Sequence, residues 1–261
     1  MAVKPRIAVH KFASCDGCQL TFLELEEDFF DLIEAVDIAY FMEATRDAQP
    51  GPYDITFVDG SVTTREEEER IKSIRADSKL LVSLGVCATH GGIQALRNFA
   101  SVDRMVADVY PRPEWIDTLP TSKPHSAFVR VDLELQGCPI NRHQLREVLT
   151  GMLAGKFPRM PSHSVCVECK RKGNICVLVL GIPCMGPVTH DGCGALCPTY
   201  HRGCYACFGP MDDPKPERFS KELELRGLSD QEILRRFREI TSAARPFVEG
   251  AESYATATHQ S

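Results

Sequence analysis

The stretch RIAVHKFASCDGCQL, residues 6–20, decides how the chain begins to fold. Its mostly apolar start, Arg6–His10, predicts a β-strand. Cys15 and Cys18 form a C-x2-C pair soon after it, within Ser14–Gln19 (SCDGCQ), and a helix is expected to follow. A single C-x2-C pair fits a redox dithiol, half of a zinc site or half of an iron–sulfur site.

Residues 1–157 alternate short apolar runs with amphipathic stretches. This pattern is typical of an α/β domain in which helices cover a mostly parallel sheet. One helix is expected where apolar residues of the range Leu25–Val36 share a helical face. Two more are expected, one capped by Thr64 with Glu67 in a capping box and one at about Asn141–Leu153. The five expected strands are Arg6–His10, Asp37–Met42, Asp54–Asp59, Lys79–Leu84 and Ala127–Leu133.

Two further cysteines, Cys87 and Cys138, follow the fourth and the fifth expected strand. The carboxyl ends of parallel strands meet at one edge of a sheet, and open sheets bind their ligands there. A single cysteine is more often a small buried apolar residue, but four thiols delivered by three strand ends favour a metal centre. Glycine beside each position lets the backbone approach a bulky ligand closely. The four candidate ligands are Cys15, Cys18, Cys87 and Cys138.

The second part of the chain, residues 158–261, has a different composition. Over Arg159–Pro210, glycine, proline and cysteine crowd together without a long periodic segment, so apolar burial alone explains its folding poorly. One or two amphipathic helices are expected after Pro214, one of them capped by Ser229, with a mobile tail from about Val248. We therefore expect a loop-rich metal-binding domain with C-terminal helices.

Eight cysteines in this second part form a strong metal-binding signal. Four thiolates suit a zinc ion as well as an iron–sulfur cluster, so their spacing alone leaves both metals open. Zinc is less favoured once the first part is included, because structural zinc sites use compact knuckles rather than cysteines scattered over strand ends. His163 is an alternative to Cys166, although choosing it would leave one of the twelve thiols unused. The eight cysteines are Cys166, Cys169, Cys176, Cys184, Cys193, Cys197, Cys204 and Cys207.

The overall composition narrows the function. The 261 residues carry a formal net charge of -6, so no basic field attracts nucleic acid or anionic lipid, and protein or small-molecule partners are expected. No apolar stretch is long enough to cross a bilayer, and Met1–His10 lacks a signal-peptide core, so a cytoplasmic location without membrane insertion is expected. In that reducing compartment we expect the twelve cysteines to bind metal rather than to form disulfides.

These motifs carry a resemblance that extends over nearly the whole chain. The C-x2-C pair, the two strand-end cysteines and the segment Pro183–Thr189 (PCMGPVT) resemble the small subunit of nickel–iron hydrogenases. The resemblance implies a flavodoxin-like domain over residues 1–157, followed over residues 158–261 by a loop-rich iron–sulfur cluster domain with C-terminal helices and a tail. It implies that the first domain holds a proximal 4Fe-4S cluster through Cys15, Cys18, Cys87 and Cys138.

The same resemblance divides the eight later cysteines between two clusters. Better-known periplasmic members have histidine where Cys166 stands, and many have a three-iron medial centre, whereas Cys197 here supplies a fourth thiolate. Both departures resemble the cytoplasmic subfamily that includes sulfhydrogenase delta subunits and heterodisulfide-reductase-linked hydrogenases. The implied ligands are Cys166, Cys169, Cys176 and Cys184 for a distal 4Fe-4S cluster, and Cys193, Cys197, Cys204 and Cys207 for a medial 4Fe-4S cluster.

The resemblance implies an oxidoreductase subunit that is not catalytic alone. A partner hydrogenase large subunit would carry the nickel–iron centre, and three clusters in this chain would relay electrons to a flavin-binding, NAD(P)-binding or other iron–sulfur acceptor subunit. The sequence itself has no complete nickel site and no Gly-x-Gly-x-x-Gly dinucleotide signature. Three alternatives are a zinc-stapled structural or interaction protein, a free-standing ferredoxin-like carrier, and a subunit like that of complex I, whose first motif has adjacent cysteines.

Overall fold

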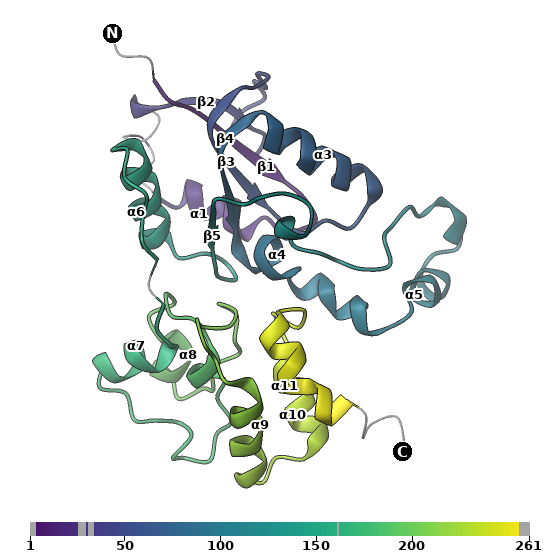
Figure 1. Ribbon diagram of the computed structural model, residues 1–261, viewed down its shortest axis with the longest axis vertical. Coiled ribbons are helices and arrows are strands. Elements are labelled where there is room, and N and C mark those ends of the chain that lie inside the picture. The colour runs from purple at the N-terminus through teal and green to yellow at the C-terminus, as the bar shows by residue number, and fades with distance from the viewer. Residues whose placement is uncertain (1–3, 26–29, 31–33, 161, 256–261) are drawn as a thin grey trace. The chain divides into compact units, whose positions relative to one another are not determined.

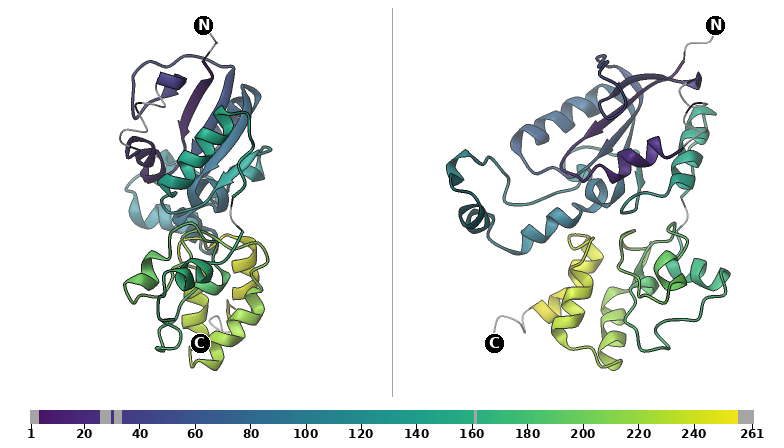
Figure 2. Two further views of the ribbon diagram at one scale, coloured as in Figure 1. Left: turned by 90° about the vertical axis from the view of Figure 1, so that its left-hand side faces the viewer. Right: turned by 180° about the vertical axis from the view of Figure 1, so that it is seen from behind.

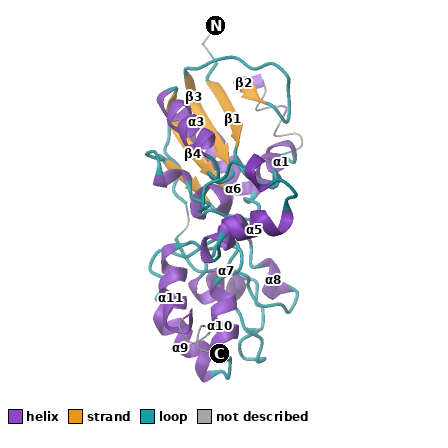
Figure 3. Cartoon of the chain, turned by 90° about the vertical axis from the view of Figure 1, so that its right-hand side faces the viewer, coloured by secondary structure: helices purple, strands orange, loops and turns teal. Residues whose placement is uncertain are grey.

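The computed structural model describes residues 4–25, 30, 34–160 and 162–255 (Figure 1). The chain divides into two compact units, Met1–Met160 and Pro161–Ser261, called unit 1 and unit 2 below. Unit 1 contains a β-sheet with flanking helices, and unit 2 consists of helices and loops (Figure 3). Within the described residues, no helix combines the length and the apolar character needed to cross a membrane.

Unit 1 is built on a five-stranded parallel sheet with the strand order β2-β1-β3-β4-β5. This order is that of the flavodoxin-like doubly wound folds. The central strands are rich in Ile, Val, Leu and Phe, as expected for strands that are covered on both faces. The strands are β1 (Arg6–Lys11), β2 (Asp37–Phe41), β3 (Tyr53–Asp59), β4 (Ser78–Leu84) and β5 (Leu133–Leu135). The predicted α/β fold with a parallel sheet is confirmed.

Helices cover both faces of this sheet (Figures 1 and 2). On one face, Phe22 of α1 and Leu145 of α6 share an apolar core with Phe57 of β3. On the other face, Ile71 of α3 shares a core with Val58, the next residue of the same strand. Adjacent strand residues therefore serve opposite faces, as the pleat requires. The helices of unit 1 are α1 (Gly17–Leu23), α3 (Arg65–Ala76), α4 (Gly85–His90), α5 (Val102–Val109) and α6 (Arg142–Leu153), with 3-10 turns at Ile93–Phe99, Pro113–Trp115 and His125–Ala127.

Two predicted helix starts in unit 1 are confirmed. The Thr64 side chain accepts the N–H of Glu67 at 3.2 Å, and the Glu67 carboxylate accepts the N–H of Thr64 at 3.1 Å, which completes the capping box of α3. Asn141 caps α6 by accepting two backbone N–H groups. The helix expected over Leu25–Val36 lies largely outside the described residues.

The prediction of a strand at Ala127–Leu133 is wrong: β5 spans Leu133–Leu135. Before it, the backbone turns, because Phe128 and Val129 both donate their N–H to the carbonyl of His125. Their apolar side chains pack on the α3 side of the sheet instead of joining its edge. The apolar run therefore reflects burial outside the sheet.

Unit 2 begins with turns and short helices and ends with three longer helices. The Ser229 side chain and Glu232 form the capping box that starts α10, as predicted. Three helices rather than one or two follow Pro214. The expectation of a mobile tail from about Val248 is wrong for residues 248–255, which belong to α11, and its remainder lies outside the described residues. The helices are α7 (Val165–Arg171), α8 (Leu196–Thr199), α9 (Pro216–Leu225), α10 (Asp230–Phe237) and α11 (Arg245–Ala255), with a 3-10 turn at Gly186–Val188.

Candidate metal centres

The first four cysteines lie just beyond the carboxyl ends of three strands. Cys15 lies between β1 and α1, and Cys18 lies in the first turn of α1. Cys87 lies in α4, which starts directly after β4, and Cys138 follows β5. Because β1, β3, β4 and β5 pair in parallel, these strand ends share one edge of the sheet.

The same four thiols lie close enough to influence one another electrostatically. Burial raises the pKa of the Cys87 thiol to about 12, and Cys138 and Cys15 contribute to the rise. Burial also raises the pKa of Cys18, with smaller contributions from Cys87 and Cys138. Holding several such thiols as thiolates requires a positive charge at the site, which a bound metal supplies.

Glycines form the walls around two of these sulfurs. Gly85 has φ +76°, and a Cβ there would overlap the sulfur of Cys18. Gly92 has φ +64°, and a Cβ there would lie 2.5 Å from the sulfur of Cys87. Side chains at either position would occupy space at the thiols, so the backbone forms a cradle of the kind a bulky sulfur-ligated group needs. Gly92 was not singled out by the sequence, in which it is one of two adjacent glycines.

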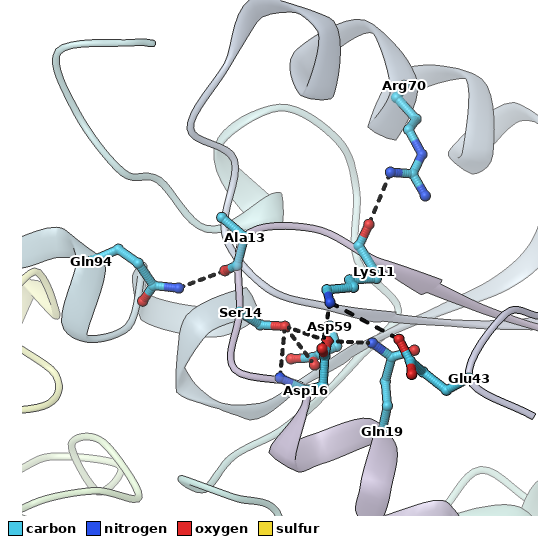
Figure 4. A network of polar contacts seen from close by, with 9 residues as sticks. All are labelled: Lys11, Ala13, Ser14, Asp16, Gln19, Glu43, Asp59, Arg70 and Gln94. Carbon is cyan, nitrogen blue, oxygen red and sulfur yellow. Dashed lines mark hydrogen bonds and ion pairs between the residues drawn. The ribbon is translucent and has the colours of Figure 1, made fainter. Parts of the chain in front are cut away.

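A polar network shapes the loop that carries Cys15 (Figure 4). Asp16 forms an ion pair with Lys11 and accepts a hydrogen bond from Gln19 at 3.2 Å. Ser14 donates to Asp59 at the end of β3, with an oxygen-to-oxygen distance of 3.0 Å. These polar contacts hold the C-x2-C loop between β1 and α1 in place.

Asp59 and Gln94 are two residues of this network that the sequence did not single out. Asp59 is 1% exposed, and burial raises the pKa of its carboxyl to about 6. Gln94 donates to the carbonyl of Ala13 at 2.6 Å, and its amide oxygen lies 3.5 Å from the sulfur of Cys87. Gln94 therefore connects the loop before Cys15 to the helix that carries Cys87, although 81 positions separate Gln94 from Ala13.

In unit 2, a second set of thiols lies on α7 and on the loop that follows it. Cys166 and Cys169 lie on α7, and Cys176 and Cys184 lie on the loop. Burial raises the pKa of Cys166 to about 11, and Cys184, Cys169 and Cys176 add to the rise in that order. Geometry brings two of these sulfurs to one place, because a Cβ on Gly186 would lie 3.3 Å from the sulfur of Cys184 and 3.6 Å from that of Cys166. His163 is exposed, and its carbonyl accepts the backbone N–H of Asp191 at 2.9 Å.

Backbone N–H groups donate to several of the sulfurs in unit 2. The N–H of Ala206 donates to the sulfur of Cys204 at 3.4 Å, and the N–H of Cys204 donates to the sulfur of Cys184 at 3.2 Å. Burial raises the pKa of Cys204 well above the usual value, with small contributions from Cys184 and Cys207. Burial likewise raises the pKa of Cys193, which neighbours Cys197. Backbone N–H groups aimed at sulfur stabilise thiolates and are typical of iron–sulfur sites.

All twelve cysteines are free thiols. Among the residues that the structure describes, no three His, Cys, Asp or Glu side chains already converge as a single-ion site. The donor set nevertheless fits iron–sulfur clusters, because it combines sets of thiols, three of them buried (Cys18, Cys184 and Cys204), with glycine walls and backbone N–H donors. Fold and donor set together define an α/β protein whose thiols are suited to sulfur-ligated metal centres.

Comparison with known sequences gives the family. Residues 15–152 match the family described as NADH ubiquinone oxidoreductase, 20 Kd subunit. Over 236 residues the chain is 36% identical to sulfhydrogenase 2 subunit delta of Pyrococcus furiosus, which covers 89% of this chain and 98% of that relative. The chain therefore belongs to this oxidoreductase family, and within it to the hydrogenase small subunits. It acts as part of a hydrogenase complex, so the predicted resemblance and oxidoreductase class are confirmed.

Solved structures agree with this assignment. One similar chain belongs to a NAD+-reducing [NiFe]-hydrogenase in the H2-reduced state, with a TM-score of 0.56, 30% identity, and coverage of 60% of this chain and 96% of that one. A second belongs to the [NiFeSe]-hydrogenase of Dm. baculatum, with a TM-score of 0.58 and coverage of 82% of this chain and 97% of that one. At 15% identity, this second likeness shows the fold alone.

Proposed function

We propose that this chain is the electron-relaying small subunit of a cytoplasmic nickel–iron hydrogenase and that it binds three 4Fe-4S clusters. The observation that carries the proposal is the set of twelve free thiols, four of them at the carboxyl edge of a flavodoxin-like sheet. When bound, the clusters would supply one-electron carriers between a nickel–iron centre on a partner large subunit and an acceptor subunit.

The grouping of the thiols supports an assignment of ligands. Mutual electrostatic influence links the four thiols of unit 1 and, separately, the four around α7. Of the other four, Cys193 neighbours Cys197, while Cys204 neighbours both Cys184 of the α7 group and Cys207. The proposed ligands are Cys15, Cys18, Cys87 and Cys138 for the proximal cluster, Cys166, Cys169, Cys176 and Cys184 for the distal cluster, and Cys193, Cys197, Cys204 and Cys207 for the medial cluster.

The protein's own contribution is to bury the sulfurs and to direct hydrogen bonds at them. The backbone N–H of Cys204 on the sulfur of Cys184 and that of Ala206 on the sulfur of Cys204 favour the thiolate form of both ligands. Burial excludes water, and both effects set the reduction potential of a bound cluster. The proximal cluster is assigned to residues 1–157 and the other two to residues 158–261, and the boundary between units 1 and 2 supports this division.

The proposed partners follow from the relatives. A large subunit is expected because the relatives are named as subunits of hydrogenases. An NAD(P)-binding acceptor is one candidate because one similar solved chain belongs to a NAD+-reducing hydrogenase. An acceptor subunit that binds flavin, NAD(P) or further iron–sulfur clusters would complete the path. The acidic net charge of -6 supports protein partners rather than nucleic acid.

The deciding experiment is a metal and sulfide analysis of the chain purified anaerobically with its native partners. We expect about twelve iron and about twelve acid-labile sulfide per chain, the content of three four-iron clusters. Iron and sulfide near four per chain would contradict the assignment in unit 2. Zinc without sulfide would overturn the electron relay and leave a zinc-stapled interaction protein. Co-purification with a protein of large-subunit size distinguishes the relay from a free-standing carrier.

A further inference from the structure

Glu168 occupies an unusual position between two cysteine segments of unit 2. It lies on α7 between Cys166 and Cys169. Its carboxylate accepts the backbone N–H groups of Gly192 at 3.1 Å, Gly194 at 3.1 Å and Ala195 at 3.2 Å. One side chain thus binds three of four consecutive residues in a loop more than 20 positions away.

That loop needs an external acceptor because its backbone is irregular. Gly192, Gly194 and Ala195 have φ values of +122°, +64° and +51°. Consecutive residues in such conformations turn their N–H groups toward a common point, which favours an anion there. Ala195 carries a Cβ, so its left-handed conformation is strained and persists only where neighbouring contacts hold it. The loop contains Cys193 and continues into α8, which contains Cys197.

We propose that Glu168 is a positioning residue that ties the Cys166–Cys169 helix to the Cys193–Cys197 loop, and that its charge lowers the reduction potential of the cluster bound by Cys193. The proposal rests on the proposed function for its second half. The first half concerns only contacts within the protein. The sulfur of Cys193 lies 3.9 Å from the Oε2 atom of Glu168, so the carboxylate acts directly beside this ligand.

The sign of the electrostatic effect follows from the charge. Reduction adds an electron to the cluster, and a nearby negative charge opposes this addition, so the potential falls. The three amide partners of Glu168 stabilise its charge without neutralising it. The ammonium of Lys172 would lie 3.4 Å from a Cβ on Gly194, so a positive charge stands beside the loop. This charge partly opposes the lowering of the potential by Glu168.

A second contact between the same segments makes variants of Glu168 informative. Asn174 donates to Thr199 on α8 at 3.0 Å and lies 3.7 Å from the sulfur of Cys169. This contact does not involve Glu168, so it continues to hold α7 near α8 when Glu168 is changed. The expected consequence of a substitution is local loosening of the loop rather than unfolding of the unit.

The test compares Glu168→Gln and Glu168→Ala with the control Glu222→Gln in the complex purified with its partners. Glu222 lies on α9, which carries no cysteine, and pairs with Arg226 at 2.8 Å, so the control loses the same charge on a different helix. We expect Glu168→Gln to keep its iron and to shift one cluster, followed by electron paramagnetic resonance during a redox titration, to a more positive potential. The proximal cluster of unit 1 and the Glu222→Gln control should keep their potentials.

Hydrogen exchange of residues 192–195 supplies a readout that does not depend on the metal. We expect exchange there to become about tenfold faster in Glu168→Ala, because several backbone donors lose a charged acceptor. Unchanged exchange in both Glu168 variants would overturn the tie. Unchanged potentials in Glu168→Gln, or an equal shift in Glu222→Gln, would overturn the electrostatic role. If the wild-type chain contains zinc and no sulfide, the electrostatic role fails with the proposed function, whereas faster exchange would still establish the tie.

Discussion

Units 1 and 2 hold their cysteines in physically different ways. In unit 1 the core is formed by strand and helix side chains such as Phe57 and Leu145, and Cys18 is its one cysteine among the described residues. In unit 2, Cys184 and Cys204 are themselves members of the apolar core, and Cys169 and Cys193 pack against it. The sheet of unit 1 is therefore specified by apolar burial and backbone pairing, with thiols attached at its edge. In unit 2 the proposed metal sites would therefore be coupled to the fold.

The second unit is itself uneven. Its helices α9, α10 and α11 pack through Phe219, Phe237 and Phe247, whose rings meet edge to face with centroids 6.4 Å and 5.8 Å apart. The cysteine-bearing segment 165–207 has only short helices joined by turns. The three C-terminal helices thus share an apolar core with a segment that has little regular secondary structure. This contrast teaches where loss of metal should be felt first.

Removal of the metal is expected to have the largest effect and to separate the two units. With a strong iron chelator under reducing conditions, residues 165–207 should lose most of their protection against hydrogen exchange. Metal-binding free energy in small sites of this kind is on the order of 10 kcal/mol and is folding free energy for the residues involved. Strands β3 and β4 should remain protected, because their backbone groups pair within the sheet.

Exchange measured by mass spectrometry decides this prediction segment by segment. The internal control is α9–α11, where protection should fall less than in residues 165–207. Loss of protection in β3 and β4 together with residues 165–207 would show that the sheet also needs its metal, and the distinction between the units would then be wrong.

A substitution at Gly85 should break the site of unit 1 without metal removal. In Gly85→Ala, the new Cβ would overlap the sulfur of Cys18, and the alanine would also have to adopt an unfavourable φ of +76°. We expect a loss of about four iron per chain, the content of one cluster. The matched control is Gly227→Ala, which has φ +87° but nothing within 4 Å of the new Cβ.

The two variants separate backbone strain from collision with a ligand. Gly227→Ala should cost roughly 1 kcal/mol of stability, the cost of a left-handed residue with a Cβ, and should keep all its iron. Iron analysis combined with urea unfolding tests both statements. Equal iron contents in the two variants would show that the sulfur of Cys18 does not hold the proximal cluster.

The sequence predicts those features whose cause is local. Apolar runs locate β1 to β4, and the pair Thr64 with Glu67 and the cap Ser229 locate two helix starts. The fifth strand could not be located in this way, because Phe128 and Val129 are apolar for a reason that lies in tertiary packing. A run of apolar residues reports burial and does not report whether the burying surface is a sheet.

The same limit applies to the candidate sites. A cysteine is a candidate metal ligand because of its residue type alone, so all twelve could be named as candidate ligands from the sequence. Asp59, Gln94 and Glu168 have ordinary residue types, and their roles depend on partners distant in the chain. Glu168 and its partner Gly192 are 24 positions apart, and nothing in the local pattern indicates their contact.

Acid should destabilise unit 1 through its buried histidines. Burial lowers the pKa of His125 to about 3 and that of His10 to about 4. Below pH 6.5 the unfolded chain binds protons that the folded chain does not, so stability falls as the pH decreases toward the folded pKa values. For His125 alone, the loss between pH 7 and pH 4.5 should be about 2–3 kcal/mol.

His125→Gln isolates this contribution. His125 is fully buried and lies 3.2 Å from the hydroxyl of Ser83, and glutamine retains a polar partner there but does not titrate. Urea unfolding of unit 1, monitored through hydrogen exchange in β4, should give a free energy of unfolding that depends less on pH in the variant than in the wild type. Equal pH dependence would show that His125 is not the source. A greater acid sensitivity in the variant would reverse the sign expected here.

The smallest expected effects come from matched helix caps, one in each unit. Thr64→Ala removes a partly buried acceptor for the N–H of Glu67, and Ser229→Ala removes an exposed acceptor for the N–H of Glu232. Loss of such a cap costs about 0.5–2 kcal/mol, and we expect Thr64→Ala near the upper end and Ser229→Ala near the lower end, because burial strengthens the lost hydrogen bond. Hydrogen exchange in α3 and α10 measures each effect locally.

These paired caps give the most sensitive test of the comparison between the units. If the units unfold independently, Thr64→Ala should accelerate exchange in unit 1 alone and Ser229→Ala in unit 2 alone, since distant sites act additively. If either variant accelerated the slowest amides of both units equally, the chain would unfold as one cooperative body. The difference between a sheet with a proposed metal site at its edge and a cysteine core proposed to fold around metal would then concern the sites alone and not the stabilities of the two units.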